Sequence, residues 1–364
     1  MIEIKYNQSL KELNTMGIDG TASAVVEWDN AIDLDCFFHY SKYSELASKP
    51  YKVIGSGSNL LFTQYRHDGV LLRCSHKEIV TVPPLNAKGA AAVDCDDEHV
   101  TLNVGAGCLL DDLIARTCAM ELWGLENLSL IPGTVGGATV QNVGAYGVEF
   151  GKLVTSVECF DPEKGCTVEL NPQQLAYKYR DSSLKHNNLI VISTSIKLKK
   201  GYSPTLNYGS LSKLKERHGN KLTPTIVRNA VIDIRRSKLP DPKYMGSAGS
   251  FFKNPILTYD EFQWIAERSH ELGLEIESMN PHPVTESDCG RYGIKISAAW
   301  LIDKSGWKGV REWNAATWPS QPLVIVNLTG QASAHDIMSL ADKIADDVKR
   351  KWGISLEREV EYIK

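Results

Sequence analysis

Short apolar runs that end in glycine-rich breaks recur along the first part of the chain. Residues 51–54 predict a strand, residues 55–59 form a Gly-Ser-Gly-Ser-Asn break, and residues 60–62 resume the apolar pattern. Residues 100–104 predict another strand, which ends in the Gly-Ala-Gly break at 105–107. Glycine adopts backbone conformations that are costly for other residues, so such breaks are typical of tight turns and of backbone that approaches a ligand closely.

The third glycine-rich segment, residues 130–147, is the densest, with five glycines in eighteen residues beside Gln141, Asn142 and Tyr146. Because glycine loses the most conformational entropy on folding, this density favours ligand contact over turns alone. Consecutive amides in such loops form a concave donor surface for anions. The three segments together predict a large anionic ligand held by the main chain, such as a dinucleotide. Leu60 stands where a Rossmann fingerprint requires glycine, so that fingerprint is excluded.

Apolar side chains at helical spacing predict three helices, and start and stop signals predict a fourth. The first follows the break at 105–107, and the second begins at Thr223 and Pro224 and ends in a hinge at residues 238–240. The capping pairs Thr258 with Glu261 and Ser333 with Asp336 begin the other two. The apolar positions are Leu109, Leu110, Leu113, Ile114 and Cys118 in the first helix, Phe262, Ile265 and Leu272 in the third, and Ile337, Leu340, Ala341, Ile344 and Val348 in the fourth, which Gly353 ends.

Composition and charge indicate an ordinary globular protein of two or three domains. The 364 residues are 43% hydrophobic and 23% charged, and the net charge of −4 shows no basic surplus for binding nucleic acid or an anionic membrane. The N-terminus lacks a secretory pattern and no apolar run reaches the length of a membrane span, so we expect a cytoplasmic protein. Residues 83–99 are interpreted as an extended surface loop.

The cysteines and histidines form no metal-binding or disulfide pattern. No two cysteines share a Cys-x-x-Cys spacing and no His-Glu-x-x-His motif occurs, so we expect no metal and reduced, mostly buried thiols. The eight cysteines are Cys36, Cys74, Cys95, Cys108, Cys118, Cys159, Cys166 and Cys289.

Residues 247–254 gather groups that suit a reaction centre. Ser250, Lys253 and Asn254 can present proton-donating, cationic and amide groups to an anionic substrate, while Phe251 and Phe252 can exclude water. The same residues could instead form a strand that follows a glycine turn and alternates exposed polar groups. This stretch alone does not decide between the two interpretations.

Several segments, in order along nearly the whole chain, resemble the UDP-N-acetylenolpyruvoylglucosamine reductase family. Residues 55–59, 131–138 and 141–147 resemble its FAD-binding loops. The others are residues 179–182, 238–242, 249–255, 299–303 and 356–360. The resemblance implies an α+β architecture: a vanillyl-alcohol-oxidase/PCMH-type FAD-binding fold with a smaller α+β substrate-binding domain. It implies FAD-binding lobes at 1–73, joined by the returning segment 351–364, and at 74–239, and a substrate-binding domain at 240–350.

What the resemblance implies about chemistry is a hydride relay. NADPH reduces FAD, and reduced FAD delivers hydride to the enolpyruvyl double bond of UDP-N-acetylglucosamine-enolpyruvate, which gives UDP-N-acetylmuramate for peptidoglycan. Ser250 would protonate the alpha carbon, while Arg180 and Glu359 would stabilise the enolate that forms. The implied FAD contacts are Gly55, Ser56, Gly57, Ser58, Asn59, Pro132, Gly133, Thr134, Gly136, Gly137, Gln141, Asn142, Gly144, Ala145 and Tyr146. The implied substrate contacts are Tyr208, Lys238, Asn254 and Gln321.

Some of these assignments depend on the resemblance alone. In isolation, Arg180 reads as a surface arginine paired with Asp181, and Glu359 alternates with Glu357 and Glu361 so that spacing cannot choose among them. Tyr208 marks the family type that carries a tyrosine loop over the nucleotide-sugar phosphates, although an ordinary turn tyrosine fits the same position. Trp318 stands where the family often carries histidine, which weakens the assignment of Gln321.

Two other functions remain open at this point. A flavin oxidase of the same broad fold would act on a small alcohol or sugar lactone, but many such enzymes tether FAD through histidine or cysteine, and residues 131–147 contain neither. A non-catalytic nucleotide-sugar-binding protein would not require Ser250 together with Arg180 and Glu359. We expect a small-molecule substrate, no nucleic acid or membrane partner, and a monomer.

Overall fold

The computed structural model describes residues 2–82 and 98–364. Residues 83–97 of the predicted surface loop, with Cys95, lie outside the described residues, and the structure resumes just before strand β7 (His99–Gly105). The chain divides into two compact units, each assembled from three segments. The first unit comprises Met1–Gln8, Ala22–Ser56 and Asp68–Arg235, and the second comprises Ser9–Thr21, Gly57–His67 and Arg236–Lys364.

The first unit contains a four-stranded sheet in the order β1-β2-β5-β3. Its strands are β1 (Glu3–Ser9), β2 (Thr21–Trp28), β5 (Arg66–Cys74) and β3 (Tyr51–Ile54), and β3 runs parallel to β5. Helix α1 (Ala31–His39) and the short α2 (Ser44–Ala47) follow β2. Trp28, Phe37 and Phe160 are almost fully buried in one apolar cluster, so α1 and this sheet share a core with residues of the second sheet.

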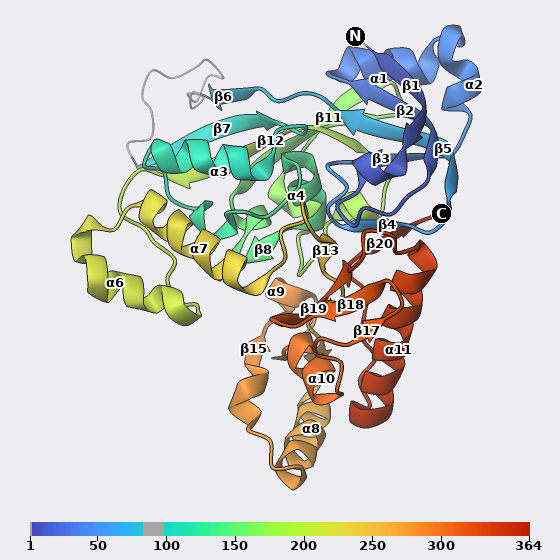
Figure 1. The fold of residues 1–364 in the computed structure, drawn as a ribbon. Coiled ribbons are helices and arrows are strands. Elements are labelled where there is room, and N and C mark those ends of the chain that lie inside the picture. Colours follow the sequence, from blue (N-terminus) through green and yellow to red (C-terminus); the bar gives the residue numbers. More distant parts are fainter. Residues whose placement is uncertain (1, 83–97) are drawn as a thin grey trace. The chain divides into compact units, whose positions relative to one another are not determined.

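The second sheet of this unit has the order β11-β10-β12-β7-β6. Its strands are β11 (Cys166–Leu170), β10 (Val154–Asp161), β12 (Ile190–Lys199), β7 and β6 (Ile79–Val82), all antiparallel. Helices α3 (Leu110–Ala119) and α4 (Val135–Gln141) lie beside this sheet in Figure 1. Their apolar side chains share one buried cluster with residues of the sheet. The glycine break at 105–107 lies where the chain leaves β7 for α3, and Gly133 precedes α4.

Smaller elements complete the first unit. They are the ribbon β8 (Gly144–Ala145) with β9 (Val148–Glu149), the one-turn α5 (Pro172–Leu175), α6 (Lys213–His218) and α7 (Pro224–Lys238). Leu214 of α6 packs with Val227 and Val231 of α7. Arg228 of α7 forms two hydrogen bonds to Asp111 of α3, at 2.6 and 2.9 Å. Burial raises the pKa of Asp111, but these bonds and one from the Leu130 N–H outweigh it and hold that pKa below its usual value.

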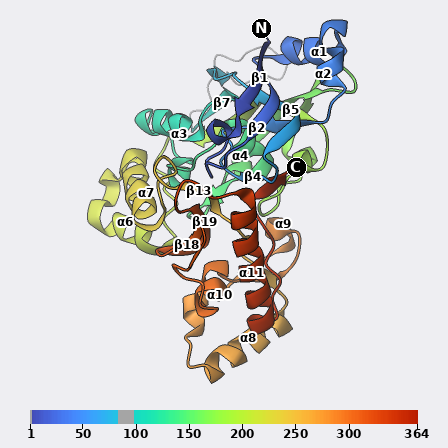
Figure 2. The same cartoon turned by 45° about the vertical axis from the view of Figure 1, so that its right-hand side comes forward.

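The second unit is built on a sheet in the order β13-β19-β18-β17, with two smaller sheets β14-β16-β15 and β20-β4. Helices α10 and α11 pack on the four-stranded sheet, and α11 is the long helix that Figures 1 and 2 show. The strands are β13 (Gly246–Ser250), β19 (Gln321–Asn327), β18 (Ala315–Trp318), β17 (Arg311–Glu312), β14 (Ile256–Leu257), β16 (Gly293–Lys295), β15 (His282–Val284), β20 (Glu361–Ile363) and β4 (Leu60–Phe62). The helices are α8 (Tyr259–Glu271), α9 (Glu286–Cys289), α10 (Ala298–Lys304) and α11 (Ala334–Trp352).

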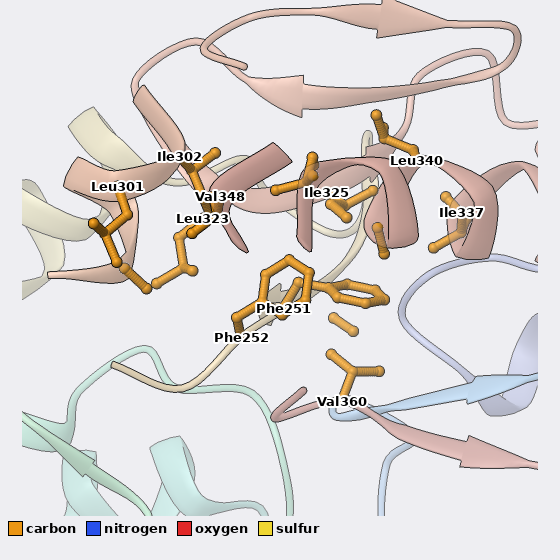
Figure 3. Close-up of a cluster of buried hydrophobic side chains, with 14 of the residues drawn as sticks. Phe251, Phe252, Leu301, Ile302, Leu323, Ile325, Ile337, Leu340, Val348 and Val360 are labelled. Carbon is orange, nitrogen blue, oxygen red and sulfur yellow. The ribbon is translucent and has the colours of Figure 1, made fainter. Parts of the chain in front are cut away.

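One apolar cluster forms the core of the second unit. Figure 3 shows Phe251 and Phe252 side by side beneath Ile325 of the sheet and Ile337 and Leu340 of α11. Phe251 and Phe252 are 0% and 1% exposed. These two aromatic rings are therefore part of the core that fixes the end of β13, which is the position of Ser250.

The four predicted helices are confirmed, with small differences at their ends. Capping boxes join Thr258 to Glu261 and Ser333 to Asp336, and Gly353 ends α11 in a left-handed conformation. Leu109 and Leu272, which we predicted on apolar faces, lie just outside α3 and α8 and are 43% and 44% exposed. Leu109 is the N-cap of α3 and Leu272 the C-cap of α8, so the periodic pattern extends one residue beyond the hydrogen-bonded helix at these ends.

The described cysteines are all free thiols, and three of them are buried. Burial raises the pKa of Cys74, Cys118 and Cys159 to about 12, so these three thiols are poor nucleophiles at neutral pH. Cys166 is exposed, contrary to the general expectation of burial. In residues 2–82 and 98–364, no group of three or more His, Cys, Asp or Glu side chains is placed to hold a metal ion, and no described helix is long and apolar enough to cross a membrane.

Candidate active site

The first glycine loop, residues 55–59, connects β3 to β4 and leaves hydrogen-bonding groups unused. Within the described chain, the N–H groups of Gly55, Ser56, Gly57 and Asn59 donate to no acceptor, and the buried Ser56 Oγ has no hydrogen-bond partner. Buried polar groups in proteins almost always have partners, so an orphaned hydroxyl beside several free N–H groups indicates a ligand site. These groups suit the pyrophosphate of a dinucleotide.

Glycine is required at position 57 for reasons of geometry. Its φ is +69°, and a Cβ atom there would lie 1.9 Å from the Leu13 carbonyl oxygen. The Gly57 carbonyl accepts a hydrogen bond from the Thr15 N–H at 3.0 Å. This close approach holds the loop from one side and fixes the direction of its N–H groups.

The third glycine segment lies against the start of the first loop. A Cβ at Gly55 would lie 2.7 Å from the Thr134 Oγ1. Thr134 is the N-cap of α4, and its hydroxyl accepts a hydrogen bond from the Gly137 N–H at 3.2 Å. The N–H groups of Val135 and Gly136 donate to the carbonyls of Cys108 and Ala106. The N–H groups of Gly133 and Thr134 have no acceptor in the described part of the chain, so the donors available here precede the helix.

The second glycine break, residues 105–107, offers an anion no donor. The N–H groups of Gly105, Ala106 and Gly107 donate to the carbonyls of Glu78, Ile192 and His76, all at 2.8 Å. A Cβ at Gly105 or Gly107 would lie 2.4 to 2.5 Å from atoms of His76 or Cys74. The expectation that all three glycine segments hold the ligand therefore fails for this one, because its glycines serve contact between backbone segments.

The end of α4 and the following ribbon carry the other predicted cofactor contacts. Gln141 is the last residue of α4, and Asn142 caps it with a left-handed φ of 48°. The Asn142 side chain donates to the Lys178 carbonyl at 2.8 Å and accepts from the Gly151 N–H at 2.9 Å. Its amide is thus used to shape the loop.

Arg180 lies in a strained turn beside this ribbon. Lys178 and Asp181 exchange both backbone hydrogen bonds across the turn, and Arg180 has a φ of 56°, a conformation that costs a non-glycine residue about 1–3 kcal/mol. Its Nη2 donates to the Gly144 carbonyl at 2.6 Å, whereas the Asp181 carboxylate bonds to His186 at 2.9 Å. The structure therefore directs Arg180 to the predicted cofactor-binding ribbon. Sequence alone suggested Asp181 as its partner.

Tyr146 and Tyr208 meet in the first unit. Their rings are 5.4 Å apart in an edge-to-face arrangement, with Tyr208 46% exposed. Burial raises the pKa of the Tyr146 phenol, and the positive charge of Arg235 opposes this shift. The contact links the end of the third glycine segment to the predicted tyrosine loop.

Ser250 and Glu359 are brought together by backbone pairing within the second unit. The Phe251 carbonyl accepts the Glu359 N–H at 2.9 Å, the Lys253 N–H donates to the Glu357 carbonyl at 2.8 Å, and Phe252 bridges Arg358. Of the three alternating glutamates, only Glu359 is half-buried, since Glu357 and Glu361 are exposed. Glu357 pairs with Lys253 at 2.6 Å. These environments distinguish Glu359, which spacing could not do.

The predicted substrate contacts occupy varied positions. Lys238 is the exposed last residue of α7, and Asn254 Oδ1 accepts the Ala298 N–H at 3.0 Å, where α10 begins. Gln321 begins β19 opposite Trp318, and its buried Oε1 has no partner among the described residues. An orphaned amide oxygen is consistent with a ligand contact at Gln321.

Sequence reasoning missed Asn127. This fully buried residue donates to the carbonyls of Tyr146 at 2.7 Å and Thr205 at 2.9 Å. It therefore ties the third glycine segment to the stretch that leads to Tyr208. The signal available in the sequence was a polar pair, Glu126 and Asn127, within an apolar run.

The chain is similar to known proteins over its whole length. Residues 40–171 match the FAD binding domain family, and residues 241–363 match the family of the UDP-N-acetylenolpyruvoylglucosamine reductase C-terminal domain. The UDP-N-acetylenolpyruvoylglucosamine reductase of Shewanella sediminis is 35% identical over 365 residues, which cover 100% of this chain and 97% of the relative. That of Bacteroides fragilis is 37% identical over 373 residues, which cover 100% of both chains.

The chain belongs to the UDP-N-acetylenolpyruvoylglucosamine reductase family. The crystal structure of the Thermus caldophilus UDP-N-acetylenolpyruvylglucosamine reductase matches it with a TM-score of 0.63 and 25% identity, covering 100% of this chain and 99% of the other. The predicted family, the α+β fold with its FAD-binding domain, and the assignment as an oxidoreductase of peptidoglycan-precursor synthesis are confirmed. The open N–H groups of Gly55, Ser56, Gly57 and Asn59 in the described chain, with the orphaned Ser56 hydroxyl, fit the FAD that this family binds.

Proposed function

We propose that this enzyme uses NADPH to reduce the enolpyruvyl group of UDP-N-acetylglucosamine-enolpyruvate, and so forms UDP-N-acetylmuramate. When bound, FAD supplies the hydride chemistry, accepting hydride from NADPH and passing it to the substrate. Family membership over the full length supports this proposal, and the pairing of residues 251–253 with 357–359, which holds Ser250 near Glu359, is the observation that carries it.

In this proposal, residues of the chain stabilise the negative charge of the enolate and supply the proton to the alpha carbon. Hydride adds to the carbon beta to the substrate carboxylate, so the electron pair of the double bond moves to the alpha carbon and the carboxylate as an enolate. Arg180 and Glu359 bind and orient this group, and the fixed positive charge of Arg180 stabilises it. Ser250 gives its hydroxyl proton to the alpha carbon and regains one from solvent. A serine hydroxyl is a weak acid, so alignment must supply much of its effect.

Loop residues 55–59 and the residues of the third glycine segment are proposed to bind FAD. Tyr208, Lys238, Asn254 and Gln321 are proposed to bind the nucleotide sugar, with Tyr208 on a loop of the tyrosine-bearing family type. In this scheme residues 1–73, 351–364 and 74–239 form the flavin-binding part and residues 240–350 bind substrate. We propose a monomer that works in the cytoplasm, where nucleotide sugars and NADPH are available.

The proposal is tested by separating the two half-reactions of Ser250→Ala. We expect FAD affinity and anaerobic flavin bleaching by NADPH to stay normal, while reoxidation by the enolpyruvyl nucleotide slows by roughly 10²- to 10⁴-fold, the usual contribution of a general acid. Ser355→Ala, an exposed serine of the same unit, is the matched control and should behave as wild type. Equally slow flavin reduction in Ser250→Ala would contradict the assigned role. Failure of the substrate to reoxidise the wild-type flavin, together with rapid flavin reduction by a small alcohol and rapid reoxidation by oxygen, would favour an oxidase.

A further inference from the structure

Glu359 lies at a junction between two pairs of extended segments. Its N–H donates to the Phe251 carbonyl at 2.9 Å, where residues 357–359 run antiparallel to residues 251–253. Two residues later β20 begins, and it runs parallel to β4. Glu359 thus lies between two backbone pairings. The first joins residues 357–359 to residues 251–253, next to Ser250, and the second joins β20 to β4, which follows the first glycine loop.

Asn59 holds the other side of this junction. Its Nδ2 donates to the Glu359 carbonyl at 3.1 Å, and its own carbonyl accepts the Glu361 N–H at 3.0 Å. Asn59 therefore bonds on both sides of Val360, which is 4% exposed and packs in the core. These two hydrogen bonds restrict the backbone of residues 359–361. Because the Glu359 carboxylate is attached to that backbone, they also restrict where the carboxylate can lie.

The same residue closes the loop that has free N–H groups. Its backbone N–H has no acceptor in the described ranges, while the loop is held from the other side by the contact of Gly57 with Leu13. The side chain and the carbonyl of Asn59 are thus bonded within the protein, whereas its backbone N–H is left for a ligand acceptor. The resemblance assigned Asn59 only to cofactor binding.

We infer that Asn59 is a positioning residue for Glu359, which couples the order of the first glycine loop to the placement of that carboxylate. This inference rests on the proposed role of Glu359. When a ligand orders residues 57–59, the side-chain bond from Asn59 fixes the peptide of Glu359. The oxidative half-reaction, in which substrate is reduced, then depends on Asn59 more strongly than flavin reduction by NADPH does.

A double-mutant cycle on the FAD-loaded enzyme tests this coupling. Asn59→Asp keeps the size of the side chain but replaces the donor by an oxygen that faces the Glu359 carbonyl. At saturating FAD, we expect it to slow flavin reoxidation by the enolpyruvyl nucleotide roughly tenfold and to slow flavin reduction by NADPH by a smaller factor. In a Glu359→Gln background, Asn59→Asp should have almost no further effect on reoxidation, because the group it positions is already lost.

The outcomes separate the inference from the proposed function. If Glu359→Gln slows reoxidation but the two substitutions act additively, the positioning role is overturned and the proposed function stands. If Glu359→Gln leaves reoxidation unchanged, the proposed catalytic role of Glu359 fails, and the inference with it. Equal slowing of both half-reactions by Asn59→Asp would indicate a merely structural role.

Amide exchange gives a second measurement, which reports on the backbone directly and does not require turnover. We expect FAD to protect the peptide covering residues 355–364 together with the loop 55–59. In Asn59→Ala, protection of the loop should persist while that of residues 355–364 is lost. Unchanged protection of both segments in the variant would overturn the coupling.

Discussion

Residues 55–59 and 105–107 are both glycine turns at the end of a strand, yet the protein uses them in different ways. In the first, the N–H groups of Gly55, Ser56, Gly57 and Asn59 have no acceptor in the described chain, and the Ser56 hydroxyl is buried without a partner. In the second, every N–H group from Gly105 to Cys108 donates to a carbonyl of the protein. Glycine content therefore does not identify a ligand loop, whereas the accounting of donors does.

The largest expected effect is at Gly57. Gly57→Ala adds a Cβ 1.9 Å from the Leu13 carbonyl at a φ of +69°, so backbone must move. We expect a loss of more than about 3 kcal/mol in the free energy of unfolding, together with loss of FAD from the folded fraction. Chemical denaturation and flavin absorbance measure the two effects. Gly201→Ala, where no atom lies within 4 Å of the added Cβ, is the control and should change neither.

The second turn should respond in stability alone. Gly105→Ala places a Cβ 2.4 Å from the His76 ring and 2.6 Å from its carbonyl, so we expect about 2–3 kcal/mol of destabilisation. The dissociation constant of FAD, measured at a temperature where the variant is folded, should remain that of the wild type. A selective loss of FAD affinity without a fall in stability would break the contrast between the two turns.

Ser56 should show the opposite behaviour. Ser56→Ala removes a buried hydroxyl that has no partner in the described chain, so the apoprotein should be as stable as the wild type or slightly more stable. FAD affinity, measured by fluorescence titration, should fall about fivefold to tenfold, because one hydrogen bond to the ligand is lost. Ser41→Ala, at an exposed serine, serves as the control. Destabilised apoprotein with unchanged FAD affinity would mean that the hydroxyl serves the fold.

The smallest overall effect is expected at Gly137. Its added Cβ meets only the Thr134 Oγ1, at 3.5 Å, and it lies in a helix, where alanine is favoured over glycine by about 0.5–1 kcal/mol. Gly137→Ala should therefore raise the apoprotein's melting temperature slightly while weakening FAD binding, since the protein itself does not need this glycine. Unchanged FAD affinity would remove Gly137 from the proposed cofactor contacts.

Much of the local structure could be predicted from short-range patterns. The helices beginning at Pro224, Tyr259 and Ala334 were predicted from their caps and apolar spacing, because those signals act within one or two turns. The glycine loop between β3 and β4 was predicted for the same reason. Leu109 and Leu272 were misplaced by one residue because periodicity does not define where hydrogen bonding stops.

Long-range pairings could not be predicted in this way. Nothing local to residues 178–181 indicates that Arg180 would bond to Gly144 and leave Asp181 to His186. Nothing near Glu359 indicates that Phe251 and Asn59 would hold its backbone on two sides. The partners of Arg180 and Glu359 lie tens to hundreds of residues away along the chain, so only the folded chain brings them together.

The amino-acid sequence by itself determined the family of this protein, its FAD-binding fold and the identity of the residues proposed for chemistry, because ordered motifs persist along the whole chain. The tertiary structure decided which glycine loop has free donors, which of three glutamates is half-buried, and what holds it. The physical reason is that hydrogen-bond satisfaction and burial belong to the assembled chain. The type of a residue determines which hydrogen bonds it can donate or accept. Only its neighbours in space determine whether those hydrogen bonds remain available to a ligand.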